Sequence, residues 1–310
     1  MPRLSQLLLR TAFTQNPLLL ILLKECRTLE QATAELRWLR EYALEKPTQH
    51  LAELCERRGR GEPLQYIIGT QPFGGLEILC RKNVLIPRPE TEHLTSNLFS
   101  QLLSHVALLP RPLRVLDLCT GTGCISLHLH ALLSAAHIPS VCTGIDIAPA
   151  AVHLARANRC HNIDAGLLPP SASTNVAFAL GNVLRPDSIL PRARVDVVVA
   201  NPPYISQRGF EQETARSVRN YEPSLALLGG GAHGDRFYPA VARIAGRMGA
   251  RVILVEVGGC EQAERIRDAW ALSGKWEGVQ IWLDYAGKGR GVVAWREGWE
   301  WVRDGPTTVG

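Results

Sequence analysis

The tetrapeptide Asn201-Pro202-Pro203-Tyr204 contains the residue types that most directly suggest chemistry. It follows residues 195–200, a segment that is apolar apart from Asp196 and typical of a strand buried on both faces of a parallel sheet. Ligands of such sheets bind beyond the carboxyl ends of the strands, so this position predicts a ligand site. An Asn-Pro pair also marks ordinary turns, and a plain turn is the alternative interpretation.

Methyl transfer to a planar amide or amine nitrogen is the chemistry that suits this tetrapeptide. An amide nitrogen is a weak nucleophile and must be held about 3–3.5 Å from the methyl donor, in line with it. The Asn201 side-chain oxygen and the Pro202 carbonyl can accept hydrogen bonds from an NH₂ group and stabilise the positive charge that develops. The prolines fix the direction of that carbonyl, and Tyr204 can pack on the planar group. We therefore predict Asn201, Pro202 and Tyr204 as catalytic and all four residues, Pro203 included, as substrate-binding.

A second loop, Asp117-Leu-Cys-Thr-Gly-Thr-Gly123, begins in the last two residues of another short predicted strand, residues 113–118. Gly121 and Gly123 allow the backbone to approach a ligand closely and to open a helix. A dinucleotide fingerprint would place a third glycine where the chain has Ser126. The glycine pattern therefore favours S-adenosylmethionine over a nicotinamide dinucleotide.

Two polar residues near the ends of later predicted strands complete the expected cofactor site. Asp146 lies at the end of residues 141–147, where an acid can accept hydrogen bonds from ribose hydroxyls. Asn182 lies at the end of residues 176–183, where it can bond the adenine edge. No histidine or cysteine spacing predicts a metal site.

The elements that would position these loops alternate between strand and helix from residue 112 onward. This alternation predicts an α/β fold with a mainly parallel, doubly wound sheet and an antiparallel end. Upstream, residues 17–60 have helical periodicity, and residues 64–86 contain short β-rich pieces, at 65–68 and 76–79, that predict a hairpin. The predicted boundaries are 25–62 for a helical domain, 63–90 for a hairpin linker, 91–303 for the sheet domain and 304–310 for a tail.

Composition indicates the compartment and the kinds of partner to be expected. The 310 residues carry a mild net charge of +5, and the eight scattered cysteines indicate free thiols in a reducing compartment. No apolar run reaches the roughly 20 residues that span a bilayer, so no membrane partner is expected. Arg3 and Arg10 lie among leucines and hydroxyl residues with no acid before Glu25, which is typical of an organelle transit segment over residues 1–24. The alternative is that these residues form the first helix of the helical domain.

Several segments together resemble the HemK/PrmC family of protein-(glutamine-N5) methyltransferases, which modify peptide-chain release factors. The resemblance extends from about residue 30 to residue 297. The tetrapeptide is shared with DNA and RNA amino-methyltransferases, whereas Pro87-Arg-Pro-Glu-Thr91 is more specific to this family. The segments that carry the resemblance are 57–69, 84–92, 117–123, 201–204, 220–227 and 234–235.

The resemblance implies a seven-stranded class I S-adenosylmethionine-dependent methyltransferase fold. The glutamine of a Gly-Gly-Gln loop would enter beside Asn201, and the helical region would bind the release factor. The N-terminal extension is similar to that of mitochondrial members, which implies the matrix, with the cytoplasm as the alternative. We expect a monomer and no direct nucleic-acid partner. The residues expected around the cofactor are Asp117, Cys119, Thr120, Gly121, Thr122, Gly123, Asp146, Asn182, Val183 and Asn201.

Two alternatives stay open at this point. A nucleic-acid adenine or cytosine amino-methyltransferase would explain the tetrapeptide and the mild basic charge, and it would need a basic, aromatic-bearing recognition region. A non-catalytic assembly factor that keeps the fold would explain Cys119, where the family often has glycine, and Asn182, where it often has an acid.

Overall fold

The computed structural model describes residues 4–189, 194–303 and 305, and these fall into two compact units. The helical unit comprises the chain up to Thr70 together with Thr214–Glu222. The sheet unit comprises Gln71–Glu213 and the chain from Pro223 onward. Arg3 of the predicted transit segment, and the predicted tail apart from Gly305, lie outside the described residues.

The helical unit is built from short amphipathic helices around a leucine core. Ser5 and Thr28 cap two of the helices by accepting hydrogen bonds from backbone N–H groups three residues later. Leu22, Leu39 and Leu54 have no exposed surface. The helices of this unit are α1 (Gln6–Gln15), α2 (Leu18–Cys26), α3 (Leu29–Glu45), α4 (Leu51–Gly59), α5 (Leu64–Ile68) and α11 (Arg216–Tyr221).

Helix α2 crosses the predicted boundary at residue 24. Leu19, Leu22 and Leu23 pack in the same core as Leu36 and Leu39 of α3. Residues 18–24 are therefore part of the helical unit. This agrees with the alternative interpretation, in which the N-terminal residues belong to the helical domain.

Residues 65–68 form helix α5, so the predicted strand at this position was wrong. The segment begins after Pro63 and ends at Gly69, which has a left-handed φ of 95°. A helical turn buries Leu64, Tyr66 and Ile67, and this tertiary packing overrides the β-propensity of the two isoleucines.

Helix α11 belongs to the helical unit although it lies far along the chain. The Ser217 hydroxyl donates to the Gly61 carbonyl at 2.7 Å, and the Tyr221 hydroxyl donates to the Arg60 carbonyl at 3.5 Å. The unit therefore contains a segment that the predicted range 25–62 did not include.

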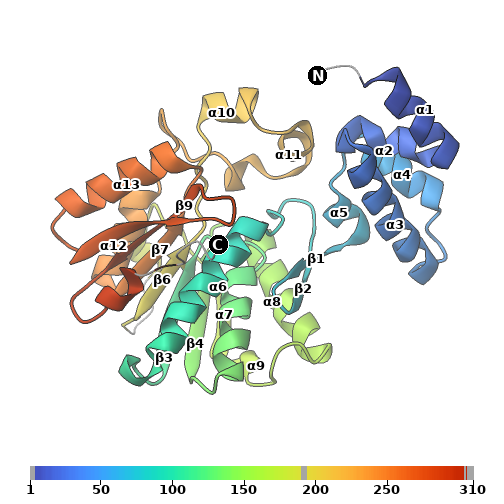
Figure 1. Cartoon of the computed structure of the whole chain (residues 1–310). Coiled ribbons are helices and arrows are strands. Elements are labelled where there is room, and N and C mark those ends of the chain that lie inside the picture. The colour runs from blue at the N-terminus through green and yellow to red at the C-terminus, as the bar shows by residue number, and fades with distance from the viewer. Residues whose placement is uncertain (1–3, 190–193, 304, 306–310) are drawn as a thin grey trace. The chain divides into compact units, whose positions relative to one another are not determined.

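The sheet unit contains a seven-stranded sheet in the order β5-β4-β3-β6-β7-β9-β8 (Figure 1). Pairing is parallel from β5 through β7 and antiparallel for β7–β9 and β8–β9. The predicted doubly wound α/β fold with an antiparallel end is confirmed. The strands are β3 (Leu113–Leu118), β4 (Ser140–Asp146), β5 (Val176–Leu180), β6 (Val197–Ala200), β7 (Val252–Glu256), β8 (Gly278–Leu283) and β9 (Gly289–Trp295).

Helices cover both faces of this sheet, as Figure 1 shows. Val197 and Val199 of β6 pack with α6, α7 and α8, while Val198 and Ala200 pack with α12 and α13. This alternation explains why β6 is wholly apolar. The helices of the sheet unit are α6 (Pro89–Ser104), α7 (Cys124–Ala135), α8 (Pro149–Asp164), α9 (Ala172–Asn175), α10 (Gln207–Gln212), α12 (Tyr238–Arg247) and α13 (Cys260–Leu272), and its 3₁₀ turns are Val106–Leu108, Pro186–Ile189, Ser224–Ala226 and Glu300–Arg303.

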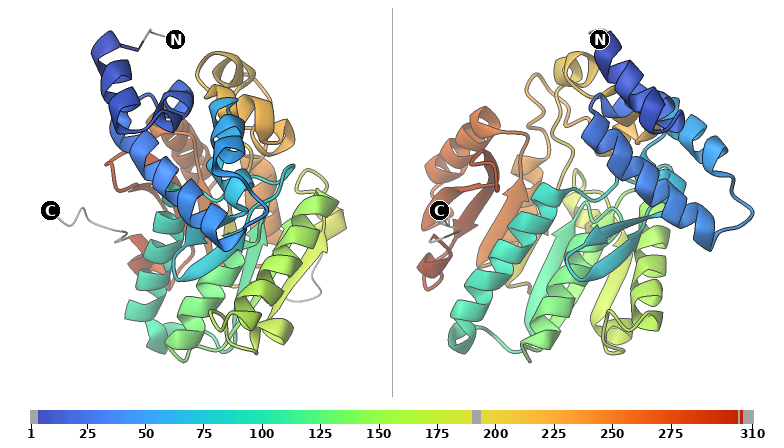
Figure 2. Two further views of the ribbon diagram at one scale, coloured as in Figure 1. Left: turned by 90° about the vertical axis from the view of Figure 1, so that its right-hand side faces the viewer. Right: turned by 45° about the vertical axis from the view of Figure 1, so that its right-hand side comes forward.

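The predicted hairpin is formed by β1 (Thr70–Phe73) and β2 (Leu76–Leu79). Strand β2 is tied to α8 by two asparagines: Asn158 Oδ1 accepts from Leu79 N at 2.6 Å, and Asn162 Oδ1 accepts from Glu77 N at 3.0 Å. Figure 2 shows β2 alongside α8. The C-terminal half of helix α8, which ends at Asp164, therefore holds the hairpin.

Candidate active site

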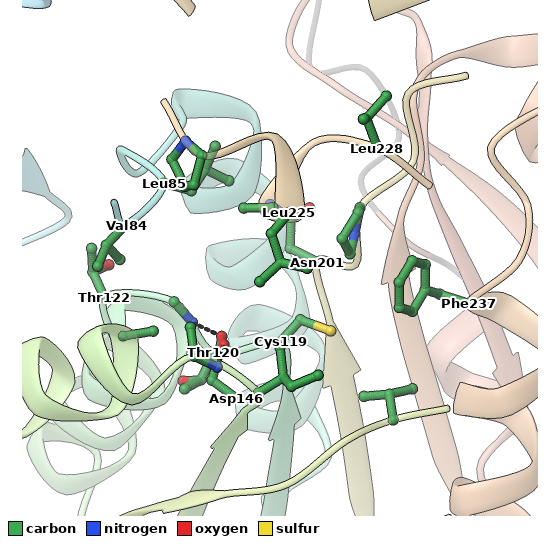
Figure 3. Close-up of a pocket in the computed structure, with 18 of the residues that line it drawn as sticks. Val84, Leu85, Cys119, Thr120, Thr122, Asp146, Asn201, Leu225, Leu228 and Phe237 are labelled. Atoms are coloured by element: carbon green, nitrogen blue, oxygen red, sulfur yellow. Dashed lines mark hydrogen bonds between the residues drawn. The ribbon is translucent and has the colours of Figure 1, made fainter. Parts of the chain in front are cut away.

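The loops that follow β3, β4, β5 and β6 meet at one pocket (Figure 3). Strands β3 and β6 are neighbours at the point where the strand order reverses, and open α/β sheets form their ligand crevice there. The pocket has a volume of about 470 Å³, within the range of about 300–1,000 Å³ typical of small-molecule sites. The predicted site residues that line it are Cys119, Thr120, Gly121, Thr122, Asp146, Asn182, Val183, Asn201 and Pro203.

Asp117 is not in the pocket lining. Its side chain has no exposed surface, and Oδ2 accepts hydrogen bonds from Thr120 Oγ1 at 2.6 Å and Ser126 Oγ at 2.8 Å. Burial raises the pKa of Asp117 to about 6. Asp117 therefore holds the loop from beneath, and Ser126, which the sequence suggested only as a missing glycine, shares that task.

The two loop glycines serve different purposes. Both have left-handed backbones, with φ of 55° at Gly121 and 82° at Gly123. A Cβ at Gly123 would lie 2.8 Å from the Phe178 ring, whereas a Cβ at Gly121 would meet nothing within 4 Å. Gly121 lines the pocket and Gly123 does not. Tight packing thus requires Gly123, and Gly121 leaves open space for a ligand.

Cys119 also has a positive φ, 61°. Glycine occupies this region without strain, which gives a physical reason for glycine being frequent there. Burial raises the pKa of the Cys119 thiol well above its usual range, so the side chain is an uncharged part of the pocket wall.

Asp146 joins the loop after β4 to the loop after β3. One carboxylate oxygen accepts from Gly121 N and the other from Ala148 N, each at 2.9 Å. Burial raises the pKa of Asp146. A carboxylate has about four acceptor positions, so this residue can still accept a hydrogen bond from a ligand's hydroxyl group.

The Asn201 side chain is oriented by helix α6. Its Nδ2 donates to Thr91 Oγ1 at 3.0 Å, while the described residues donate no hydrogen bond to its Oδ1. Asn201 and Thr91 both line the pocket. The site therefore presents an uncommitted amide oxygen at the carboxyl end of β6.

Thr91 connects Asn201 to a buried carboxylate. Thr91 Oγ1 donates to Glu256 Oε2 at 2.6 Å, and the Tyr204 hydroxyl donates to Glu256 Oε1 at 3.2 Å. Glu256 is 4% exposed, and burial raises its pKa to about 7. Neither Thr91 nor Glu256 was predicted as a site residue from the sequence, although an acid at the end of the apolar strand β7 was a visible signal.

Two members of the tetrapeptide, Pro202 and Tyr204, do not line the pocket. The Tyr204 hydroxyl is used by Glu256, and burial raises the pKa of Tyr204 far above its ordinary value. Tyr204 therefore acts here as a neutral donor that ties the end of the tetrapeptide to β7.

Residues 227–235 support the backbone of the tetrapeptide. Ile205 N donates to Leu227 O, and Gly229 N donates to Ile205 O, both at 2.9 Å. A Cβ at Gly234 would overlap the Tyr204 carbonyl oxygen. That same carbonyl accepts from Gln262 Nε2 at 3.2 Å. The close approach explains why the glycine of Gly234-Asp235 is needed beside the tetrapeptide.

The rest of the pocket wall is mainly apolar. Val84, Leu85 and Ile86 precede α6, while Leu225 and Phe237 come from the chain after Pro223. Figure 3 shows Asn201 beside Leu225, with Thr120 and Asp146 grouped nearby. Within the described residues, no cluster of histidine, cysteine, aspartate and glutamate could hold a metal ion, and no helix has the length and apolarity needed to cross a membrane.

Comparisons with known proteins give a consistent group of relatives. Residues 111–225 match a family model described as a methyltransferase domain. The chain is 38% identical over 235 residues to the mitochondrial MRF1 N(5)-glutamine methyltransferase MTQ1 of Saccharomyces cerevisiae, covering 74% of this chain and 69% of the relative. It is 34% identical over 284 residues to the probable MRF1 mitochondrial N(5)-glutamine methyltransferase mtq1 of Schizosaccharomyces pombe, covering 86% and 88%.

Bacterial and structural relatives extend this group. The release factor glutamine methyltransferase of Nitratidesulfovibrio vulgaris is 31% identical over 246 residues, covering 79% of this chain and 76% of the relative. Among solved structures, the hMettl16 catalytic domain in complex with MAT2A 3′UTR hairpin 6 superposes with a TM-score of 0.54 at 16% identity, covering 79% of this chain and 82% of that one. At this level of identity, the similarity shows a shared fold only.

Proposed function

The chain belongs to the release factor glutamine methyltransferase family, and we propose that it methylates the side-chain amide nitrogen, N5, of the glutamine in the Gly-Gly-Gln motif of a peptide-chain release factor. The methyl donor is S-adenosylmethionine. The observation that carries this proposal is the uncommitted Asn201 amide oxygen at the end of β6, beside a pocket of cofactor size.

The pocket residues fit S-adenosylmethionine in their chemistry. Asp146 offers carboxylate lone pairs suited to ribose hydroxyls, Gly121 leaves space beside the backbone, and Val183 adds apolar surface. We propose that these residues hold the cofactor together with Cys119, Thr120, Thr122, Asn182 and Asn201. When bound, the cofactor supplies an electrophilic methyl group on a sulfonium sulfur.

The residues of the chain supply orientation. The Asn201 Oδ1 and the Pro202 carbonyl accept hydrogen bonds from the substrate NH₂ group, which raises electron density on the nitrogen and stabilises the charge that develops during transfer. Because the prolines restrict the backbone, the two acceptors keep their directions. With cofactor and substrate bound, the apolar side chains of Leu225 and Phe237 should exclude water and so strengthen these hydrogen bonds.

A labelling experiment tests the proposal. The full chain is incubated with methyl-labelled S-adenosylmethionine and a mitochondrial release factor, and in parallel with the same factor carrying alanine in place of the Gly-Gly-Gln glutamine. Label should enter the first factor and be lost with the second. Equal labelling of both factors, or label in RNA or DNA instead of protein, would overturn the proposal.

We also propose that the helical unit binds the release factor and that the protein acts as a monomer. Support comes from the separate core of this unit and from α11, which lies between the tetrapeptide and the pocket-lining residues from Pro223 onward in the chain. Sedimentation should show one copy of the chain in the free protein and one copy in its complex with the release factor.

A mitochondrial matrix location is the remaining part of this proposal. Two relatives are named as mitochondrial enzymes, and Arg3 and Arg10 precede the first acid, Glu25. Since Ala12 of α1 packs in the helical core together with Leu19 and Leu22 of α2, any processing that keeps this core intact should occur before Gln6. N-terminal sequencing of the protein isolated from mitochondria tests this, and a cut after residue 24 would contradict it.

A further inference from the structure

The structure assigns Thr91 and Glu256 as positioning residues for methyl transfer: they hold the Asn201 amide with its oxygen, and not its NH₂ group, available to the substrate. This inference rests on the proposed function, and it gives roles to two residues outside the tetrapeptide. Neither residue needs to touch the reacting atoms, because both act through Asn201.

The hydrogen bonds form one chain with a defined direction. Asn201 Nδ2 donates to Thr91 Oγ1 at 3.0 Å, and Thr91 Oγ1 donates to Glu256 Oε2 at 2.6 Å. The Tyr204 hydroxyl donates to the other carboxylate oxygen at 3.2 Å. Two donors from separate elements therefore converge on one buried carboxylate.

The chemistry of the three groups fixes that direction. An ionised carboxylate only accepts hydrogen bonds, so Thr91 must use its single hydroxyl proton toward Glu256. The remaining lone pairs of Thr91 Oγ1 can then only accept, and Asn201 must turn its NH₂ group toward them. Without this chain, either end of the Asn201 amide could face the substrate.

The orientation matters because the substrate is itself an amide. Its NH₂ group donates hydrogen bonds. If the Asn201 NH₂ group faced it, two donors would lie opposite each other and no hydrogen bond could form. The same NH₂ group would also repel the positive charge that develops on the nitrogen during transfer. Only in the turned orientation does Asn201 offer an acceptor to the reacting nitrogen.

The surrounding structure keeps Glu256 in place. It is the last residue of β7, and its backbone carbonyl accepts from the buried Tyr238 hydroxyl at 3.1 Å. The positive charge of Arg290 partly offsets the cost of burying the carboxylate. The backbone that carries the carboxylate is thus fixed independently of Thr91 and Asn201, and the Tyr204 hydroxyl holds the second carboxylate oxygen.

Helix α6 places Thr91 at the matching position. Pro89 occupies the start of this helix, where its missing N–H is tolerated, and Thr91 follows within the first turn. The segment Pro87-Arg-Pro-Glu-Thr91 therefore fixes where α6 begins and hence where the threonine hydroxyl lies. This gives the segment a physical connection to the tetrapeptide 110 residues away.

The test compares Thr91→Val with Thr91→Ser in the full chain. Valine keeps the shape and removes the hydroxyl, so kcat for release factor methylation should fall about 10- to 100-fold through misorientation. Serine keeps the hydroxyl and should restore most of the activity. Binding of S-adenosylhomocysteine, measured by calorimetry, should change less than about threefold in either variant, since cofactor contacts stay in place.

Thr95→Val is the matched control. Thr95 lies one turn further along α6, is equally buried, and donates its hydroxyl to the Thr91 carbonyl at 2.6 Å without reaching Asn201. It should lower the melting temperature about as much as Thr91→Val while kcat stays near that of the unsubstituted chain. Equal loss of kcat in the two valine variants would show a merely structural role and overturn the inference.

A double substitution separates this inference from general damage. In an Asn201→Ala background, Thr91→Val should cause no further loss of kcat, because there is no amide left to orient. Losses that multiply would overturn the positioning role. An unsubstituted chain that fails to methylate any release factor would instead contradict the proposed function, so the two failures are distinguishable.

Discussion

The two loops of the pocket are stabilised in contrasting ways. The loop from Asp117 to Gly123 is held by neighbours: Thr120 and Ser126 donate to Asp117, and Gly121 donates to Asp146 at the end of the adjacent strand. The tetrapeptide is held from distant parts of the chain, with Thr91 on α6, Glu256 on β7 and Gln262 on α13. The cofactor loop is thus a local structure, whereas the catalytic loop depends on the assembled fold.

Substitutions in the two loops should therefore have different consequences. Substitutions around Asp146 and Gly121 should affect cofactor binding. Substitutions around Asn201 and its distant supports should affect the chemical step.

Asn201→Ala should produce the largest effect. Removing the amide acceptor should lower kcat about 100- to 1,000-fold, the scale observed when one preorganised polar contact to a developing charge is removed. Calorimetry with S-adenosylhomocysteine should show binding within a few-fold of the unsubstituted chain, because the cofactor loop is held locally. Loss of cofactor binding comparable to the loss of kcat would show that the two loops are not separable.

Activity should also depend on the protonation of Glu256. Burial raises its pKa to about 7; the negative charge of Glu90 also raises it, whereas Arg290 and the Tyr204 hydroxyl lower it. As pH falls through about 7 the carboxylate takes up a proton, can donate to Thr91, and no longer fixes Asn201, so kcat should fall. Glu256→Gln should have a kcat several-fold lower at pH 8 and should lack this inflection.

Glu256→Gln should lower kcat at pH 8 but raise the free energy of unfolding at that pH. A carboxyl whose pKa rises from 4.5 to about 7 on folding binds more protons in the folded state between these values. Its contribution to the free energy of unfolding therefore decreases as pH rises from 4.5 to 7. Glu256→Gln should stabilise the protein at pH 8 on the order of 1–3 kcal/mol relative to its effect near pH 4, as measured by urea unfolding. A pH-independent difference would contradict the raised pKa.

Asp146→Asn should weaken cofactor binding about tenfold, because a neutral amide accepts ribose hydrogen bonds less strongly than a carboxylate. At saturating cofactor its kcat should change little. The inverse pattern, with normal binding and low kcat, would contradict the division between the two loops.

Gly121→Ala and Gly123→Ala form a matched pair for the smallest effects. Both glycines have positive φ, so each alanine should cost about 1–2 kcal/mol of backbone strain. Only Gly123→Ala adds a clash, with the Phe178 ring, and it should have the lower melting temperature. Gly121→Ala should weaken S-adenosylhomocysteine binding more strongly, because its methyl group enters the open side of the loop.

The same contrast explains what the sequence could predict. The sheet, the cofactor loop and the placement of Asn201 all follow from local signals, namely apolar runs, glycines and polar residues at strand ends. Asp117 was expected at the ligand and instead lies beneath the loop, since a sequence shows that a polar residue ends a strand but not which way it faces. Thr91 and Glu256 meet Asn201 only because α6 and β7 pack beside β6, and that meeting is a property of the tertiary structure.

In the helical unit, too, contacts between distant segments could not be predicted from the sequence. The apolar periodicity of α3 was readable from the sequence, but the contribution of α11 depends on contacts between Ser217 and Gly61, which are 156 residues apart. Helix α5 was predicted as a strand because its isoleucines favour β structure, and only the core that it enters decides otherwise.

Mass spectrometry of the modified release factor shows directly whether the chain methylates the Gly-Gly-Gln glutamine and whether Asn201 is needed. The factor is treated with the full chain and S-adenosylmethionine, digested, and the Gly-Gly-Gln peptide is fragmented to locate the added methyl group. We predict one methyl group on the glutamine side chain with the unsubstituted chain and strongly reduced modification with Asn201→Ala. A methyl group on another residue, or undiminished glutamine methylation by Asn201→Ala, would contradict the account.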